Sequence, residues 1–418
     1  MHRTVRSVAI SLGLLAGLLL LPGSALALPH SSARDLSSQR VCSQAARGYA
    51  ACDSLRVVHA NGKPFNAKPT AAATIAGYYP SDLQSAYNLT SASASQGSGQ
   101  TVAIVDAYND PDIEGDVITY RKEFGLPALV ACTVKGGKVV SPGPGPCGAR
   151  VSETGSTTVL PANNASWSEE ISLDADMVSA ICPKCNILLV EANTPLLTDL
   201  GTAVNEAVKL GATEVSNSYG GSESPADTTY DTAYYDHPGV AITASSGDDG
   251  YGVNYPAASQ YVTAVGGTTL SPASNARGWT ETAWSDAGSG CSAYDPEPSW
   301  QTSAFSTSLC AMRGVADVSA DANPDTGVAV YDSYAYEGYS GWLVFGGTSV
   351  ASPITASVYA LAGNAASVTY GSYPYSHTSS LNDVTSGSNG SCGTALCNAG
   401  PGWDGPTGLG TPNGTGGF

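Results

Sequence analysis

The chain has 418 residues, of which only 12% are charged, and its 35 acidic residues outnumber its 17 basic ones to give a net charge of −18 at pH 7. Such a surface repels nucleic-acid phosphates, which disfavours nucleic acid as a partner. At acidic pH many of the carboxylates are protonated, which relieves self-repulsion and indicates a protein that tolerates acid.

The N-terminus has the pattern of a secretory signal. Basic residues at its start precede an apolar run over residues 8–21, and Ala25-Leu26-Ala27 forms a small-x-small cleavage site. A transmembrane anchor would need about 20 apolar residues. We therefore expect a signal peptide over residues 1–27, an extracellular product, and no membrane attachment after signal removal.

Residues 28–77 are rich in serine and alanine and lack convincing periodicity, so we interpret them as a short leader or pro-segment. Strands separated by helices follow, within a single large domain over residues 78–418. The predicted strands are 101–105, 187–190, 213–218, 240–244 and 261–265; the predicted helices are 112–124, one from about 168, and 196–210; residues 139–164 are a predicted loop. This order predicts an α/β fold with a doubly wound, mainly parallel sheet flanked by helices, whose active site lies at the carboxyl ends of the strands.

The ten cysteines suit an oxidising destination and fall into neighbouring pairs. Sequential pairing is the simplest of many connectivities and would staple short loops. Cys182-Pro183-Lys184-Cys185 also has the spacing of zinc and redox sites, but the second pair or the βαβ context that such sites need is not visible. The proposed disulfides join Cys42 with Cys52, Cys132 with Cys147, Cys182 with Cys185, Cys291 with Cys310, and Cys392 with Cys397.

Ser349 is the strongest candidate nucleophile. It follows Gly346-Gly347-Thr348 and precedes an apolar helical stretch over residues 354–362. Small residues allow a tight turn, and the positive end of a helix favours the oxyanion that a nucleophile generates. A serine in this place is also typical of a helix cap, so the interpretation needs a partner base. None of the five histidines is followed by Gly-Thr, as a subtilisin-type triad would require, so the base must be another group.

Two carboxylates on the helix near 168 supply that base. Glu170 and Asp174 fall on the apolar stripe that predicts the inward face, whereas Glu169 and Asp176 lie off it and are expected to be solvated. Like charges one turn apart cannot both ionise easily, so the pair should share a proton and act as a general base at acidic pH. The alternative is a first-turn acid favoured by the helix dipole.

Two further acids follow predicted strands. Asp248, in Ser246-Gly247-Asp248-Asp249-Gly250, is either a turn residue or a protonated carboxyl that donates a hydrogen bond to an oxyanion. Asp106 follows the first predicted strand and has the same turn alternative.

Several motifs occur in an order that resembles the sedolisin, or serine-carboxyl peptidase, family, which has a subtilisin-like fold. The similarity covers roughly residues 78–413. The motifs are Glu170-x-x-x-Asp174, Pro183-Lys184-x-Asn186-Ile187, Ser218-Tyr219-Gly220-Gly221, Ser246-Gly247-Asp248-x-Gly250, Gly347-Thr348-Ser349-x-x-x-Pro353 and Gly400-Pro401-Gly402-Trp403-Asp404-x-x-Thr407-Gly408-Leu409-Gly410.

The resemblance implies Ser349 as nucleophile, Glu170 as general acid and base, Asp174 as its proton-sharing partner and Asp248 as the oxyanion-hole acid. It also implies that Asp106 extends this network. One calcium ion near the C-terminus is implied as well, bound by the carboxylates of Asp383 and Asp404 and the backbone carbonyls of Val384, Gly400 and Gly402.

Family members carry a long, separately folded propeptide, whereas about fifty residues separate the predicted signal from the catalytic region here. This departure leaves the means of keeping the enzyme inactive open. We expect a secreted, monomeric serine-carboxyl endopeptidase that cleaves proteins or peptides at acidic pH through an acyl-enzyme. The alternatives are a tripeptidyl-type exopeptidase of the same family and an inactive secreted binding protein on the same fold.

Overall fold

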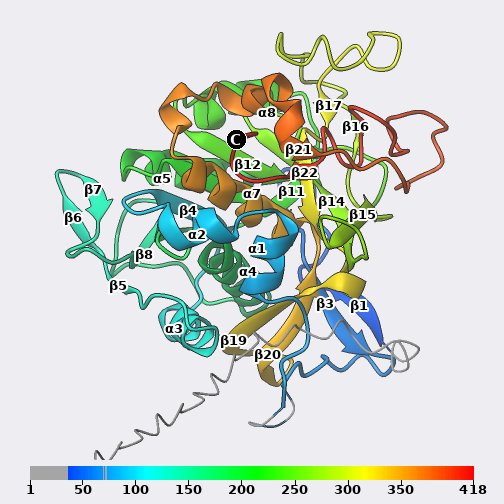
Figure 1. Cartoon of the computed structure of the whole chain (residues 1–418). Coiled ribbons are helices and arrows are strands. Elements are labelled where there is room, and N and C mark those ends of the chain that lie inside the picture. The colour runs from blue at the N-terminus through cyan, green and yellow to red at the C-terminus, as the bar shows by residue number, and fades with distance from the viewer. Residues whose placement is uncertain (1–35, 69, 71–72) are drawn as a thin grey trace, which may run out of the picture.

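A computed structural model describes residues 36–68, 70 and 73–418, so the predicted signal peptide lies outside the described residues. A nine-stranded sheet forms the centre of the molecule (Figure 1). Its order is β15 (Trp279–Ala283), β14 (Thr263–Pro272), β12 (Ala241–Ser245), β10 (Glu214–Asn217), β4 (Thr101–Ala107), β9 (Asn186–Ala192), β8 (Cys147–Ser152) and β5 (Val130–Ala131), with β18 (Val318–Asp321) paired to β14. Only the β14–β15 pair is antiparallel in this sheet, which confirms the predicted mainly parallel α/β fold.

Helices bury the sheet. Strands β4 and β9 are buried along their whole length, as expected of parallel strands covered on both faces. The helices α4 (Ala165–Ile181) and α7 (Thr348–Ala362) pack against each other and the sheet, and α5 (Leu197–Lys209) packs against β9, β4 and β10. The outer helices are α1 (Pro80–Ala86), α2 (Thr90–Ser95), α3 (Ile113–Glu123), α6 (Asp227–Tyr230) and α8 (Tyr373–Ser376).

A second sheet lies below α4 in Figure 1 and includes part of the predicted leader. Its order is β1 (Leu36–Arg40), β3 (Leu55–His59), β20 (Tyr339–Gly346) and β19 (Val328–Tyr336). The leader also supplies β2 (Ala51–Cys52), which pairs antiparallel with β11 (Tyr219–Ser222). The sequence analysis expects no regular elements there, because strands of two to five residues are too short to show a period.

Two other boundaries differ from expectation. The predicted loop over residues 139–164 contains β8, which forms a full strand of the central sheet. Helix α7 begins at Thr348, well before residue 354, because Pro353 is accommodated inside its second turn. The remaining short strands are β6 (Thr133–Lys135), β7 (Lys138–Val140), β13 (Asn254–Tyr255), β16 (Gly290–Cys291), β17 (Gly314–Val315), β21 (Leu381–Asn382) and β22 (Thr411–Pro412).

All ten cysteines lie in the described part of the chain, and they form the five sequential disulfides that the spacing predicts. Cys182 and Cys185 bind each other at the end of α4, so neither is available to a metal. The two disulfides nearest the C-terminus join Cys291 with Cys310 and Cys392 with Cys397. Each bridge spans at most 19 residues, so the disulfides staple local loops and leave the packing of distant elements to the core.

Within the described ranges, no helix has the length and apolar character needed to cross a membrane.

Candidate active site

Ser349 is buried at the second position of α7, directly after the N-cap Gly347 and Thr348. Gly347 has φ of 104°, and a Cβ there would collide with the carbonyl oxygen of Asp53 and with Oδ2 of Asp248. The position therefore requires glycine. The backbone N–H of Ser349 has no partner within its helix and points at an acceptor outside it, the Asp53 carbonyl oxygen at 2.9 Å. The helix start thus presents both a hydroxyl and an amide donor.

Three buried carboxyl groups lie beside this serine. Asp106 lies near the end of β4, Glu170 and Asp174 lie on α4, and their carboxylate oxygens lie within 4.8 Å of one another. Burial raises the pKa of each well above its ordinary value, and neighbouring carboxylates raise the pKa values of Asp106 and Glu170 further. The structure therefore brings together the three acids named from the sequence in a cluster that holds protons.

Hydroxyl groups connect this cluster to Ser349. The hydroxyl of Ser349 donates to the backbone oxygen of Ser218 at 3.2 Å, and the hydroxyl of Ser218 donates to Oδ1 of Asp174 at 2.8 Å. The hydroxyls of Ser349 and Ser54 lie close enough to Glu170 to lower its pKa against the effect of burial. Neither Glu170 oxygen has a partner with full hydrogen-bond geometry among the described residues. Glu170 is thus adjacent to the nucleophile and free to accept its proton.

The expectation that Glu169 and Asp176 are solvated is wrong, because both side chains are buried. The second sheet packs against the side of α4 that the stripe assigns to solvent. Arg56 of β3 binds Glu169 at 2.6 Å, and the backbone N–H of Tyr331 donates to Asp176 at 2.9 Å. A hydrophobic stripe identifies one packed face, and partners from distant segments satisfy the acids on the other.

Asp248 lies after β12 and faces the start of α7. Its Oδ1 accepts hydrogen bonds from the backbone N–H and the hydroxyl of Thr348, both at 2.8 Å. Its Oδ2 has no partner among the described residues. Burial, and then the nearby Asp53, raise the pKa of Asp248 well above its ordinary range. A protonated Oδ2 and the Ser349 N–H together form a pair of donors next to the nucleophile.

Sequence reasoning did not identify Asp53, Ser54 or Thr348 as site residues, and it included Ser218 only within a motif. Asp53 and Ser54 reach the site only through the tertiary path of the leader. Their one local sequence signal is the adjacent Cys52, which pairs with Cys42.

The proposed calcium ligands occupy a loop closed at its base by pairing of β21 and β22. The N–H of Gly402 donates to Asp383 and that of Gly400 to Asp404, both at 3.0 Å. Asp404 is fully buried, and burial raises its pKa to about 7 with a further contribution from Asp383. Two adjacent carboxylates without a basic partner among the described residues, in a loop that also carries backbone carbonyls, match the hard oxygen donors that calcium prefers. The residues therefore fit the ion.

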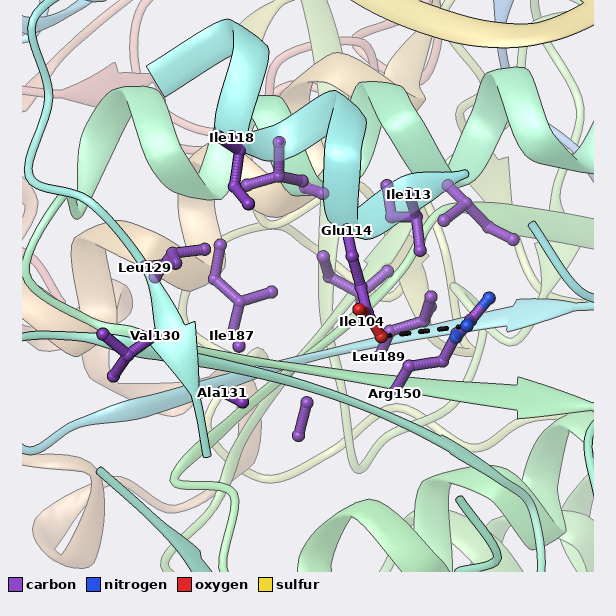
Figure 2. A pocket seen from close by; sticks show the side chains of 15 residues that line it. Ile104, Ile113, Glu114, Ile118, Leu129, Val130, Ala131, Arg150, Ile187 and Leu189 are labelled. Atoms are coloured by element: carbon purple, nitrogen blue, oxygen red, sulfur yellow. Dashed lines mark ion pairs between the residues drawn. The ribbon is translucent and has the colours of Figure 1, made fainter. Parts of the chain in front are cut away.

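An apolar pocket of about 150 Å³ lies elsewhere, between α3 and the edge of the central sheet (Figure 2). Side chains of Ile113, Ile118 and Ile187 point into it, and an ion pair of 3.7 Å joins Glu114 to Arg150. None of the candidate catalytic residues lines this pocket. Since it holds neither a nucleophile nor a base, the candidate chemistry remains at Ser349.

Comparison with known proteins gives matches over most of the chain. No family model matches. The chain is 32% identical over 384 residues to kumamolisin from Bacillus sp. (strain MN-32), covering 84% of this chain and 64% of that protein. It is 29% identical over 392 residues to sedolisin from Pseudomonas sp. (strain 101), covering 84% of this chain and 62% of that protein. The chain thus spans just under two thirds of the length of these relatives.

A solved structure agrees with these matches. Pseudomonas sedolisin, described as a serine-carboxyl proteinase complexed with two molecules of pseudo-iodotyrostatin, superposes with a TM-score of 0.66. It is 26% identical to this chain, and the superposition covers 82% of this chain and 96% of that one. The subtilisin-like arrangement expected from the sequence is confirmed.

Proposed function

Because the chain belongs to the sedolisin family of serine-carboxyl peptidases, we propose that it is a secreted endopeptidase that hydrolyses peptide bonds at acidic pH. The observation that carries this proposal is the placement of Ser349, at a helix start, against a buried cluster of carboxyl groups and a separate oxyanion acid. Its five disulfides suit export to an oxidising compartment.

In the proposed mechanism, Oγ of Ser349 attacks the substrate carbonyl while Glu170 accepts its proton. Asp174, oriented by the Ser218 hydroxyl, shares the proton held by the acid cluster. The Ser349 N–H and protonated Asp248 stabilise the tetrahedral oxyanion. Glu170 then protonates the leaving amine, and water hydrolyses the acyl-enzyme by the reverse proton path.

The acidic optimum follows from the direction of the pKa shifts. Asp248 can donate to an oxyanion only while it is protonated, and burial raises its pKa. As pH rises, the cluster and Asp248 lose protons, so both the donor and the shared proton are lost. Histidine takes no part: His237 bonds Asn205, and His377 stacks on Tyr373.

The cleft favours endopeptidase over tripeptidyl exopeptidase activity. Residues of this chain occupy it on the N-terminal side of Asp53 for more than three positions. Cys52 and Ala51 pair with β11, and the Ala50 N–H donates to the Pro195 carbonyl at 2.8 Å. A tripeptidyl peptidase needs a closed end after the third position, and the chain continues past it here.

The proposed calcium ion would be held by the carboxylates of Asp383 and Asp404 and by the carbonyls of Val384, Gly400 and Gly402. It would neutralise the two carboxylates and crosslink the loop over residues 383–410. The site lies outside the catalytic cluster, so the role assigned to the ion is structural.

Digestion of denatured haemoglobin and of a peptide library across about pH 2 to 8 tests the activity. We expect internal cleavage with an acidic optimum that is absent from Ser349→Ala. A neutral optimum, or full activity in that variant, would contradict the proposal.

A further inference from the structure

Residues 51–54, here called the cleft strand, lie across the active site in an extended conformation. Tyr219 pairs with Cys52 and Gly220 with Ala51, and the Asp53 N–H donates to the Ser218 carbonyl at 3.2 Å. An extended peptide that adds to the edge of a strand in this way is a common mode of peptide recognition. The chain's own leader therefore occupies the cleft as a substrate would.

One peptide bond of the cleft strand is placed at the nucleophile. The carbonyl oxygen of Asp53 accepts the Ser349 N–H at 2.9 Å and lies, with Oδ2 of Asp248, against the space above Gly347. This is the position of an oxyanion beside its two donors. On the other side of the bond, the Ser54 hydroxyl lies close to Glu170, the group that protonates a leaving amine. The Asp53–Ser54 bond thus has a catalytic group on each side.

The Asp53 side chain fills a pocket of its own. The hydroxyl of Ser245 donates to Oδ2 of Asp53 at 2.6 Å, and this oxygen lies 3.3 Å from the position that a Cβ on Gly220 would take. Asp53 is buried, and burial raises its pKa to about 7. The side chain is therefore neutral at acidic pH and compatible with this enclosed site.

The chain is anchored on both sides of this bond. Upstream, the Cys42–Cys52 disulfide closes a loop that ends one residue before Asp53. Downstream, Leu55 and Arg56 pair with Gly346 and Phe345 of β20, and Arg56 binds the buried Glu169. Five residue pairs between β1 and β3 connect the two sides directly. Hydrolysis would leave the new ends held together by this pairing.

We propose that the leader is a built-in inhibitor of the active site and that Ser349 of the same chain cleaves the Asp53–Ser54 bond. This inference rests on the proposed peptidase function and adds to it a processing site and a means of regulation. Inhibition persists after cleavage, because the β1–β3 pairing retains residues 36–53. It ends when that fragment dissociates and opens the cleft.

The step is balanced by water. Oγ of Ser349 forms an ester with the Asp53 carbonyl carbon, and its proton passes to Glu170. The C–N bond to Ser54 breaks, and the Ser54 nitrogen takes the proton from Glu170 to leave as an amine. Water then hydrolyses the ester, releasing Asp53 with a free carboxyl group and restoring the Ser349 hydroxyl.

Mapping of N-termini by mass spectrometry on the purified full chain tests the cleavage. After incubation at about pH 4, where Asp53 is neutral, we expect a new N-terminus at Ser54 in the wild type and none in Ser349→Ala. Ser54→Pro should leave the bond intact, whereas the control Ser274→Pro, at an exposed position away from the cleft, should be processed as the wild type is. Melting curves for all variants show whether each has folded.

Inhibition is tested on processed enzyme freed of its N-terminal fragment. Its activity on a peptide library should exceed that of Ser54→Pro by at least about tenfold. A synthetic peptide of residues 40–53 with the Cys42–Cys52 disulfide should inhibit it, and the same peptide with both cysteines replaced by serine should bind about tenfold less tightly, because the closed loop is preorganised.

The outcomes separate the two proposals. If the unprocessed chain digests the library as fast as the processed chain, or the closed peptide does not inhibit, the inference is overturned while the peptidase function stands. If neither form digests the library at any pH, the peptidase function fails and the inference fails with it.

Discussion

Ser218 donates a hydrogen bond from its hydroxyl to Oδ1 of Asp174 at 2.8 Å, while its backbone oxygen accepts the hydroxyl of Ser349 at 3.2 Å. One residue thus contacts both the nucleophile and the inner carboxyl group of the proton-sharing pair. Pro353, which has no N–H, leaves the Ser349 carbonyl without its usual helical donor, and the Ser218 hydroxyl lies 3.5 Å from that oxygen. Ser218 is therefore a positioning residue that the stripe on α4 could not reveal.

Ser218→Ala should lower kcat about tenfold, the scale of losing one hydrogen bond to an acid. The bond from Ser218 lowers the Asp174 pKa, so its removal raises that pKa and shifts the acidic limb of the kcat profile to higher pH. Pre-steady-state and steady-state rates across the pH range measure both effects. Ser357→Ala is the control, since Ser357 is a buried serine of α7 whose hydroxyl has no partner among the described residues. An unshifted limb would show that Ser218 does not tune Asp174.

Substitution of Asp248 separates its role as a donor from its charge. Asp248→Ala should reduce kcat about 10²-fold or more, the usual effect of removing one oxyanion donor. Asp248→Asn keeps a donor that does not titrate, so it should retain more of its own maximal activity at neutral pH than the wild type does. The wild-type loss there follows from the raised Asp248 pKa, because deprotonation removes the donor as pH rises. Identical relative profiles for wild type and Asp248→Asn would assign the neutral-pH loss to the Glu170 cluster instead.

The sequence predicts the catalytic acids well because Glu170 and Asp174 are one helical turn apart on an apolar stripe, which is local information. Ser349 is similarly local, since small residues and a following helix define its turn. Glu169 and Asp176 were misassigned because their burial depends on strands β3 and β19, which return to α4 from distant parts of the chain. Asp53 and Ser54 went unrecognised for the same reason, because their place in the cleft follows from pairing with β11 and β20.

The disulfides show the same division between local and distant information. Cys291 with Cys310 and Cys392 with Cys397 are neighbours along the chain, so the shortest-loop pairing predicts them correctly. No such rule predicts that the loop closed by Cys42 and Cys52 delivers residue 53 to the nucleophile, because that depends on where the whole loop packs.

Fold stability should fall between acidic and mildly alkaline pH. Burial raises the pKa of Glu214 to about 8 and that of Glu191 to about 8, whereas an unfolded Glu titrates near about 4.3. The unfolded chain therefore binds fewer protons than the folded one between these values, and this stabilisation is lost as pH rises through the folded pKa. Melting temperatures measured from about pH 4 to 8 should decline, and Glu214→Gln should reduce the decline. Glu114→Gln, at an exposed position, is the control that should leave the slope unchanged; an equal slope in Glu214→Gln would remove Glu214 from this account.

Calcium should raise the melting temperature through the loop over residues 383–410. Asp404 is buried beside Asp383, and its Oδ1 accepts from the N–H and hydroxyl of Thr407 at 3.0 and 2.8 Å. A bound cation would neutralise the two acids, and binding to the folded state alone would stabilise it by about 2.7 kcal/mol at 100 times the dissociation constant. Differential scanning calorimetry with calcium or with a chelator should show a difference in the wild type that is absent from Asp404→Ala. Asp325→Ala, at an exposed residue outside the loop, should keep the full difference. If Asp404→Ala responds to calcium as the wild type does, the ion binds elsewhere and these ligands are wrong.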